Sequence, residues 1–244
     1  MKKLNFKNLK VAIKKILFPA DYTCELCGKE IFGGRYFCDD CLKILPFNDN
    51  FICLKCGRKI KDAYPVCLQC KSNMPTYSVA RSPFSYQDEM VKLIKKFKMG
   101  SKYLADVFVG YLKETFLEHY GGCDYIISVP TSEKSLKRRG YDQAELLAEK
   151  LSKEVGVTYL KGALVKTRET ANQKFLSQKE RAENLKGSFR VHERKLIKDK
   201  TICLVDDVLT TGATANAVAR VLFKAKAQRV LVLTIASVPN KSEI

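Results

Sequence analysis

Acidic, hydroxyl and glycine residues are concentrated between residues 202 and 214, where the chain reads Ile-Cys-Leu-Val-Asp-Asp-Val-Leu-Thr-Thr-Gly-Ala-Thr. The apolar run at 202–205 is too short for a helix and predicts a buried parallel strand. Two carboxylates, Asp206 and Asp207, follow that run, and a helical pattern begins at Ala213. Acids and a small polar loop therefore stand where a strand leads into a helix.

The loop after the acids suits a phosphate group, because backbone N–H groups and the dipole at a helix N-terminus attract anions. A glycine lets the backbone approach closely. The neighbouring carboxylates repel phosphate but accept hydrogen bonds from sugar hydroxyls. We therefore expect a ribose 5-phosphate site; the alternative is a turn in which Asp and Thr only cap a helix. The loop residues are Thr210, Thr211, Gly212, Ala213 and Thr214.

Eight of the ten cysteines form four Cys-x-x-Cys pairs that repeat with a period of 29 residues. Thiolates at this spacing close tetrahedral zinc sites without an open position, so we expect two structural zinc ions. Disulfides are disfavoured because the N-terminus lacks a signal-peptide pattern. Each repeat is expected to hold its own ion, and an interleaved arrangement remains the alternative. The ligands are Cys24, Cys27, Cys38, Cys41, Cys53, Cys56, Cys67 and Cys70.

Charge separates this chain from an average globular protein, since 44 Lys and Arg against 26 Asp and Glu give a net charge of +18. This excess favours phosphate-bearing partners, single-stranded DNA included, although a solvated Lys-rich surface explains it equally well. The apolar runs are too short for a membrane span. We expect a cytoplasmic protein with a basic amphipathic helix over residues 1–20.

The pattern after the cysteines predicts an α/β domain with a parallel sheet. Strands are expected at 78–86, 125–129, 158–165, 202–205 and 229–236, and helices at 88–98, 103–119, 144–151 and 213–226. A basic loop with Arg138, Arg139 and Gly140 follows the second of these strands, at the sheet edge where such folds bind ligands. Asp142 and Glu145 form a capping-box-like pair just beyond it.

A long polar excursion at 166–190 interrupts the sheet pattern and is predicted to be a lid. A second capping-box-like pair, Ser177 and Glu180, predicts a short helix within it. The polar residues of this segment include Arg168, Thr170, Gln173, Ser177, Arg181 and Asn184.

Residues 202–214 resemble the ribose-phosphate signature of type I phosphoribosyltransferases, whose ligand is phosphoribosyl diphosphate (PRPP). The combination with a cysteine-rich module is similar to the ComF (ComFC) family of competence proteins. The other residues that carry this resemblance are Val129-Pro130, Arg139-Gly140-Tyr141-Asp142-Gln143, and the Arg168 to Asn184 pattern.

The resemblance implies a fold and a set of roles. It implies a type I phosphoribosyltransferase-like parallel sheet flanked by helices at 77–240, preceded by a double zinc ribbon at 21–76. Asp206 and Asp207 would act on the ribose, residues 138–140 would receive the diphosphate, and 166–190 would close as the lid. Magnesium would accompany PRPP.

The family also implies a cytosolic role in DNA uptake during natural transformation, alongside a helicase-like partner (ComFA). Thr210 stands where purine-salvage relatives carry an acid, which disfavours hypoxanthine or guanine salvage. Two functions stay open: transfer of a phosphoribosyl group to an unidentified acceptor, and a non-catalytic adaptor that binds ribose phosphates and DNA.

Overall fold

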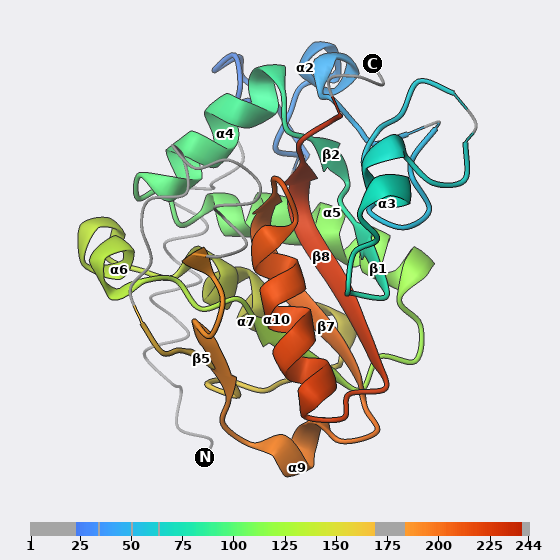
Figure 1. Cartoon of the computed structure of the whole chain (residues 1–244). Coiled ribbons are helices and arrows are strands. Elements are labelled where there is room, and N and C mark those ends of the chain that lie inside the picture. Colours follow the sequence, from blue (N-terminus) through green and yellow to red (C-terminus); the bar gives the residue numbers. More distant parts are fainter. Residues whose placement is uncertain (1–22, 34, 50, 63, 169–183, 241–244) are drawn as a thin grey trace, which may run out of the picture. The chain divides into compact units, whose positions relative to one another are not determined.

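The computed structural model describes residues 23–33, 35–49, 51–62, 64–168 and 184–240 of the 244-residue chain (Figure 1). The expected basic helix over residues 1–20 lies outside these ranges. The chain divides into two compact units, residues 1–45 and residues 46–244. The first cysteine repeat belongs to the first unit, and the second repeat belongs to the larger unit that contains the sheet.

A parallel sheet forms the centre of the larger unit, with strand order β1-β8-β7-β3-β4 and β2 added beside β8. All of these pairs are parallel, as expected from the continuous apolar runs. β7 and β8 are central and almost fully buried. The strands are β1 (Val79–Arg81), β2 (Phe84–Ser85), β3 (Tyr125–Ser128), β4 (Thr158–Tyr159), β7 (Thr201–Leu209) and β8 (Arg229–Ser237).

Helices cover both faces of this sheet. Figure 1 shows α10 in front of β7 and β8, with α5 and α7 behind the sheet. These three helices turn their apolar sides inward; Leu222 of α10 and Leu147 of α7 are fully buried. The helices of the sheet unit are α4 (Asp88–Lys98), α5 (Leu104–His119), α6 (Glu133–Arg139), α7 (Gln143–Val155), α9 (Arg194–Ile197) and α10 (Ala213–Lys224).

Two expected strands are each divided in the structure. The expected strand at 158–165 is wrong as one element: β4 ends at Tyr159, and Gly162 turns the chain with φ 73°. β5 (Leu164–Lys166) then leaves the main sheet and pairs antiparallel with β6 (Phe189–Val191). The expected strand at 78–86 is likewise split into β1 and β2, with Pro83 between them.

The two cysteine repeats share one local fold. In each repeat the first cysteine N–H donates to a carbonyl five residues later, Lys29 in one repeat and Arg58 in the other, at 2.8 and 2.9 Å. Each second Cys-x-x-Cys pair starts a short helix, α2 (Asp39–Ile44) or α3 (Leu68–Ser72). The 29-residue sequence period is therefore also a structural repeat.

Candidate functional site

Asp206 and Asp207 lie at the carboxyl end of β7, on the edge of the sheet where parallel α/β folds bind ligands. β7 does not end before the acids, as the apolar run suggested. It continues to Leu209, because Asp206 and Val208 still pair with Thr234 and Ala236 of β8. Both carboxyl groups are therefore carried on the strand itself.

The chain after β7 turns sharply into α10. Gly212 is the N-cap of this helix and has φ 81°, a left-handed conformation that favours glycine. The Thr211 hydroxyl accepts a hydrogen bond from the Ala213 N–H at 3.3 Å. The first amides of any helix have no partner within the helix, so this end of α10 presents donors and positive potential.

One pocket brings the acid and the loop together. It is lined by Val129, Leu204, Asp206, Val208, Leu209, Thr210, Gly212, Thr214, Ala215, Val232 and Thr234. These residues come from β7 and β8, from the position after β3, and from the turn and first residues of α10. The structure thus gathers the Asp206 carboxylate, part of the hydroxyl-bearing loop and a helix N-terminus around one space. Three other residues predicted for the ribose 5-phosphate site, Asp207, Thr211 and Ala213, are not among the lining residues of this pocket.

The carboxylates at this edge influence one another. Burial, followed by the charge of Asp207, raises the pKa of Asp206 to about 8. One carboxylate oxygen of Asp206 accepts a hydrogen bond from the Asp207 N–H at 2.8 Å. The charge of Asp142 raises this pKa further. Asp206 consequently holds a proton at neutral pH unless a bound group or cation stabilises its ionised form.

Lys98, the last residue of α4, supplies the nearest positive charge. Its Nζ lies 2.9 Å from Oδ2 of Asp207, and both side chains are largely shielded from solvent. Lys98 also lowers the pKa of Asp206. No local pattern in the sequence marks this lysine, because the contact joins positions 109 residues apart in the chain (207 minus 98).

The expected basic loop at residues 138–140 is a helix terminus instead. Ser132 accepts a hydrogen bond from the Ser135 N–H and starts α6, and Gly140 ends it with φ 75°. The Gly140 N–H already donates to the Leu136 carbonyl at 2.7 Å. The Gly140 amide is therefore already bonded, so Arg138 and Arg139 can reach an anion through their side chains, and Arg139 also donates to Gln143 at 2.6 Å.

Asp142 connects this region to β3. Its carboxylate accepts hydrogen bonds from the Glu145 N–H at 3.1 Å and the Thr131 N–H at 2.8 Å. The first bond confirms the predicted cap of the following helix, α7. The second bond fixes the chain directly after β3. Asp142 thus positions the segment that leads from the sheet edge into α6.

Most of the predicted lid lies outside the described residues, including Thr170, Gln173, Ser177 and Arg181. Arg168 is described, and its guanidinium donates to the carbonyls of Asn184 and Lys186 at 3.0 and 2.9 Å. β5 and β6 pair on either side of the segment. The two ends of the predicted lid are therefore held together at one place.

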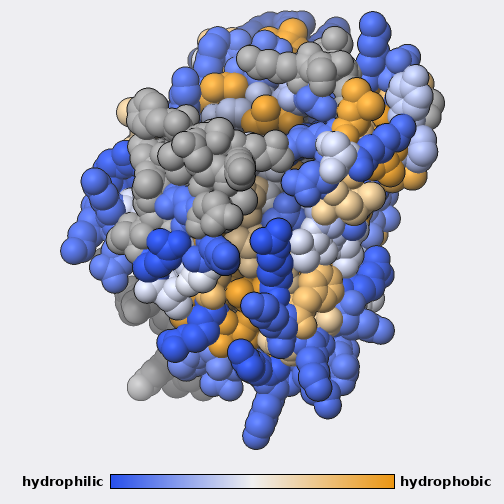
Figure 2. Space-filling view, viewed as in Figure 1, coloured by the Kyte–Doolittle hydropathy of each residue, from blue (hydrophilic) through white to orange (hydrophobic). Residues whose placement is uncertain are grey.

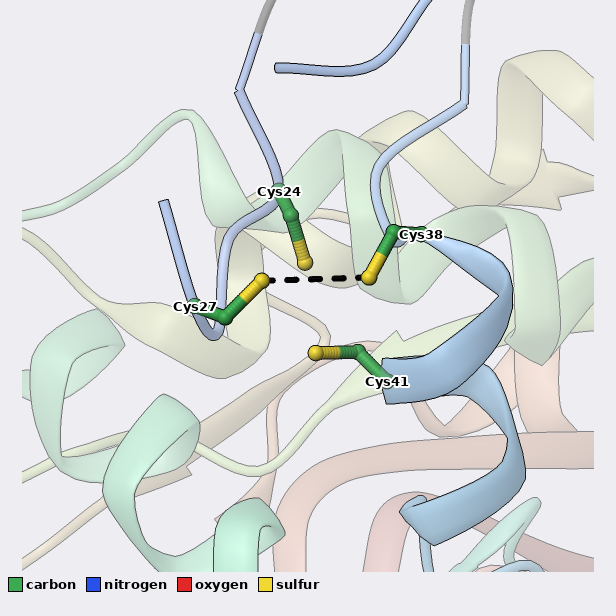
Figure 3. Close-up of side chains that lie close together, drawn as sticks. All are labelled: Cys24, Cys27, Cys38 and Cys41. Atoms are coloured by element: carbon green, nitrogen blue, oxygen red, sulfur yellow. Dashed lines mark hydrogen bonds between the residues drawn. The ribbon is translucent and has the colours of Figure 1, made fainter. Parts of the chain in front are cut away.

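The first cysteine cluster consists of Cys24, Cys27, Cys38 and Cys41, whose sulfur atoms converge on one point (Figure 3). The Sγ atoms of Cys27 and Cys38 lie 3.8 Å apart. Tetrahedral zinc with Zn–S bonds of about 2.3 Å separates its sulfur ligands by about 3.8 Å. The cluster therefore has the size that a zinc ion requires.

The second cluster consists of Cys53, Cys56, Cys67 and Cys70, all buried. The Sγ atoms of Cys56 and Cys67 lie 3.7 Å apart. Cys53 Sγ accepts hydrogen bonds from the N–H groups of Cys56 and Cys67 at 3.5 and 3.3 Å. Hydrogen bonds, first from the Cys56 side chain, hold the pKa of Cys53 well below its usual range. Both clusters are sequential, each within one repeat, and the interleaved arrangement is excluded.

Comparison with known proteins agrees with this architecture. Residues 13–76 match the double zinc ribbon domain, and residues 135–243 match the phosphoribosyl transferase domain. The fold and the two clusters therefore define a phosphoribosyltransferase-domain protein that carries a double zinc ribbon.

Named relatives resemble nearly the whole chain. Competence protein F of Haemophilus influenzae is 28% identical, covering 83% of this chain and 97% of its own. Competence protein ComFC of Bacillus subtilis is 27% identical, covering 90% and 93%. DNA utilization protein YhgH of Escherichia coli K12 is 28% identical, covering 82% and 90%. These relatives agree with the resemblance to the ComF family that the motifs indicated.

Proposed function

We propose that the pocket between β7 and α10 binds a ribose 5-phosphate group, and that its complete ligand is PRPP, which adds a diphosphate to that group. The observation that carries this proposal is that Asp206 and the Gly212-capped start of α10 line the same pocket. The α10 amides and the hydroxyls of Thr211 and Thr214 bind the phosphate. The ionised carboxylates accept hydrogen bonds from the ribose diol.

We assign the diphosphate of PRPP to the basic side chains at the end of α6. Arg138 and Arg139 end α6, and guanidinium groups bind phosphate oxygens in pairs. Magnesium binding at this site would depend on PRPP being bound. Among the described residues, the groups of three or more Cys, His, Asp or Glu that converge on one point are the two cysteine clusters. A magnesium ion would take most of its oxygen ligands from the diphosphate and water.

Calorimetry tests this assignment directly. The wild-type protein is titrated with ribose 5-phosphate, and with PRPP in the presence of magnesium. Asp206→Asn combined with Asp207→Asn should weaken PRPP binding by at least about tenfold, since both diol acceptors are lost. Asp106→Asn, which removes an exposed carboxylate on α5, is the matched control. Absence of heat from both ligands with the wild-type protein would overturn the proposal.

The same site can support phosphoribosyl transfer. In that reaction the bond between the anomeric carbon and the diphosphate breaks, diphosphate leaves, and an acceptor nucleophile forms the new bond. Ionised Asp206 and Asp207 would stabilise the positive charge that develops on the ribose. Release of labelled diphosphate in the presence of nucleobases or DNA identifies an enzyme. Tight PRPP binding without release identifies the adaptor.

We further propose that the protein acts on single-stranded DNA in the cytoplasm during DNA uptake. Three relatives are named for competence or DNA utilization. The net charge is +18, and hydrophilic side chains predominate on the face shown in Figure 2. Among the described residues, no helix is both long and apolar enough to span a membrane. A helicase-like protein would be the natural partner for such a role.

Salt dependence tests this second part. Binding of a labelled single-stranded oligonucleotide should weaken at least about tenfold between about 50 mM and about 200 mM salt, because each phosphate contact releases counterions. The variant that combines Asp206→Asn with Asp207→Asn should still bind the oligonucleotide if the positive surface charge alone is responsible for binding. An affinity that does not change with salt would contradict the proposed role.

A further inference from the structure

One basic residue beside the cysteines is exposed in the first repeat and buried in the second. Adding the period of 29 to Lys29 gives Arg58, so the two residues occupy equivalent positions. Lys29 is exposed and lies 3.7 Å from Asp40. Arg58 is only 4% exposed. Since a buried charge is costly without partners, the second repeat has a specific use for Arg58 that the first repeat lacks.

Arg58 joins the second cluster to the phosphate-binding loop. One guanidinium nitrogen donates to Gln69, which lies in α3 between Cys67 and Cys70. Another donates to the backbone carbonyl of Thr210, the first residue of the loop. Four thiolates around one zinc ion carry a net charge of about −2, which favours a guanidinium beside them. The negative charge of the zinc-loaded cluster thus balances the charge of Arg58. The guanidinium group at the same time reaches the Thr210 carbonyl of the loop.

Two further contacts connect the end of the ribbon to the same loop. The Thr76 N–H donates to the side chain of Asn216, in the first turn of α10, at 2.7 Å. The Tyr77 hydroxyl lies 3.6 Å from the position that a Cβ on Gly212 would take. The second ribbon and the residue directly after it therefore contact the loop at its beginning, at its glycine and at the helix that follows.

A fixed carbonyl also fixes the next amide. The peptide unit is planar and trans, so the Thr210 carbonyl and the Thr211 N–H point in opposite directions. With the carbonyl turned to Arg58, the Thr211 N–H is directed away from the ribbon. We propose that Arg58 is a positioning residue that couples the second zinc ribbon to the ribose-phosphate pocket by holding this loop in its anion-binding conformation. This inference rests on the proposed function of the pocket.

Arg58→Met tests the coupling, with Lys29→Met at the equivalent position of the first repeat as the control. Hydrogen exchange of the peptide that contains residues 210–214 should become at least about tenfold faster in Arg58→Met. Ribose 5-phosphate binding should weaken by about tenfold, because fewer molecules hold the competent loop. Arg58→Lys should recover only part of both effects, since one ammonium lacks the guanidinium fork. Lys29→Met should change neither measurement.

The outcomes separate positioning from simple stability. If Arg58→Met retains zinc and its melting temperature falls while loop exchange and affinity match the wild type, the proposal is overturned. If Arg58→Met does not fold, Gln69→Leu releases the guanidinium from α3 and should show the same faster exchange; unchanged exchange there overturns the proposal. If the wild-type protein binds no ribose phosphate, the proposed function fails, and the exchange measurement still decides the coupling.

Discussion

Lys98 Nζ lies 2.9 Å from the Asp207 carboxylate, so the end of α4 neutralises one of the two acids at the sheet edge. The other acid, Asp206, has a raised pKa despite this cation. Asp206 therefore carries a proton at neutral pH, although Lys98 lies beside its neighbour Asp207. A ligand that needs both groups as acceptors must first displace the proton from Asp206.

Ligand affinity should consequently depend on pH and on Lys98. Between about pH 7 and about pH 9, ribose 5-phosphate affinity of the wild type should rise about tenfold, as the ionised fraction of Asp206 increases. Lys98→Met raises the pKa of Asp206 further, so affinity at about pH 7 should fall and its rise should move to higher pH. Calorimetry across this range measures both effects. Lys95→Met, on the exposed side of α4, should follow the wild-type curve.

The free energy of unfolding should fall with rising pH, whereas ligand affinity should rise. The raised pKa of Asp206 means that the folded protein keeps a proton that the unfolded chain loses above its ordinary pKa of 3.8. This contribution to the free energy of unfolding is complete below about pH 4 and is lost as pH rises through about 8. Asp206→Asn removes the titration, so its urea unfolding should be less sensitive to pH in this window and more stable than wild type near pH 8. A slope equal to that of Asp106→Asn would contradict the assignment.

The two cysteine clusters should differ in what they stabilise. Cys70 belongs to the sheet unit, and its equivalent, Cys41, belongs to the first unit. Cys70→Ser should lower the main unfolding transition by at least about 5 °C, because the second cluster shares the buried core of the sheet unit. Cys41→Ser should leave that transition within about 1 °C. Metal analysis should find one zinc ion lost in each variant, and equal shifts in calorimetry would contradict this division.

Local sequence patterns predicted the elements that depend on neighbouring residues. The 29-residue period specified both clusters, and α4 begins at Asp88 and ends at Lys98 as its apolar spacing indicates. The acids and the glycine of the loop were found because strand, acid, hydroxyl and helix follow one another directly. Ser132 and Gly140 are also common helix-capping residues, but the basic composition between them led to the prediction of a loop in place of α6.

Contacts between distant segments could not be predicted in this way. Lys98 resembles the other lysines of α4 in the sequence, and only the packing of that helix brings it to Asp207. Likewise, Arg58 and Thr210 are 152 residues apart. Periodicity describes one element at a time, whereas these contacts depend on how the ribbon, helix and sheet pack together.

Equivalent glycines in the two repeats offer a test of that packing. Gly28 and Gly57 have φ 71° and 66°, so alanine is strained by its backbone conformation at both positions. A Cβ at Gly57 would lie 2.4 Å from the Ala80 carbonyl oxygen of β1, whereas a Cβ at Gly28 would meet nothing within 4 Å. Gly57→Ala should therefore destabilise its unit by about 1–3 kcal/mol more than Gly28→Ala destabilises the first unit. Denaturant unfolding of both variants, followed by hydrogen exchange in β1 and at 24–33, measures the difference, and equal losses would show that the second repeat does not pack tightly on the sheet.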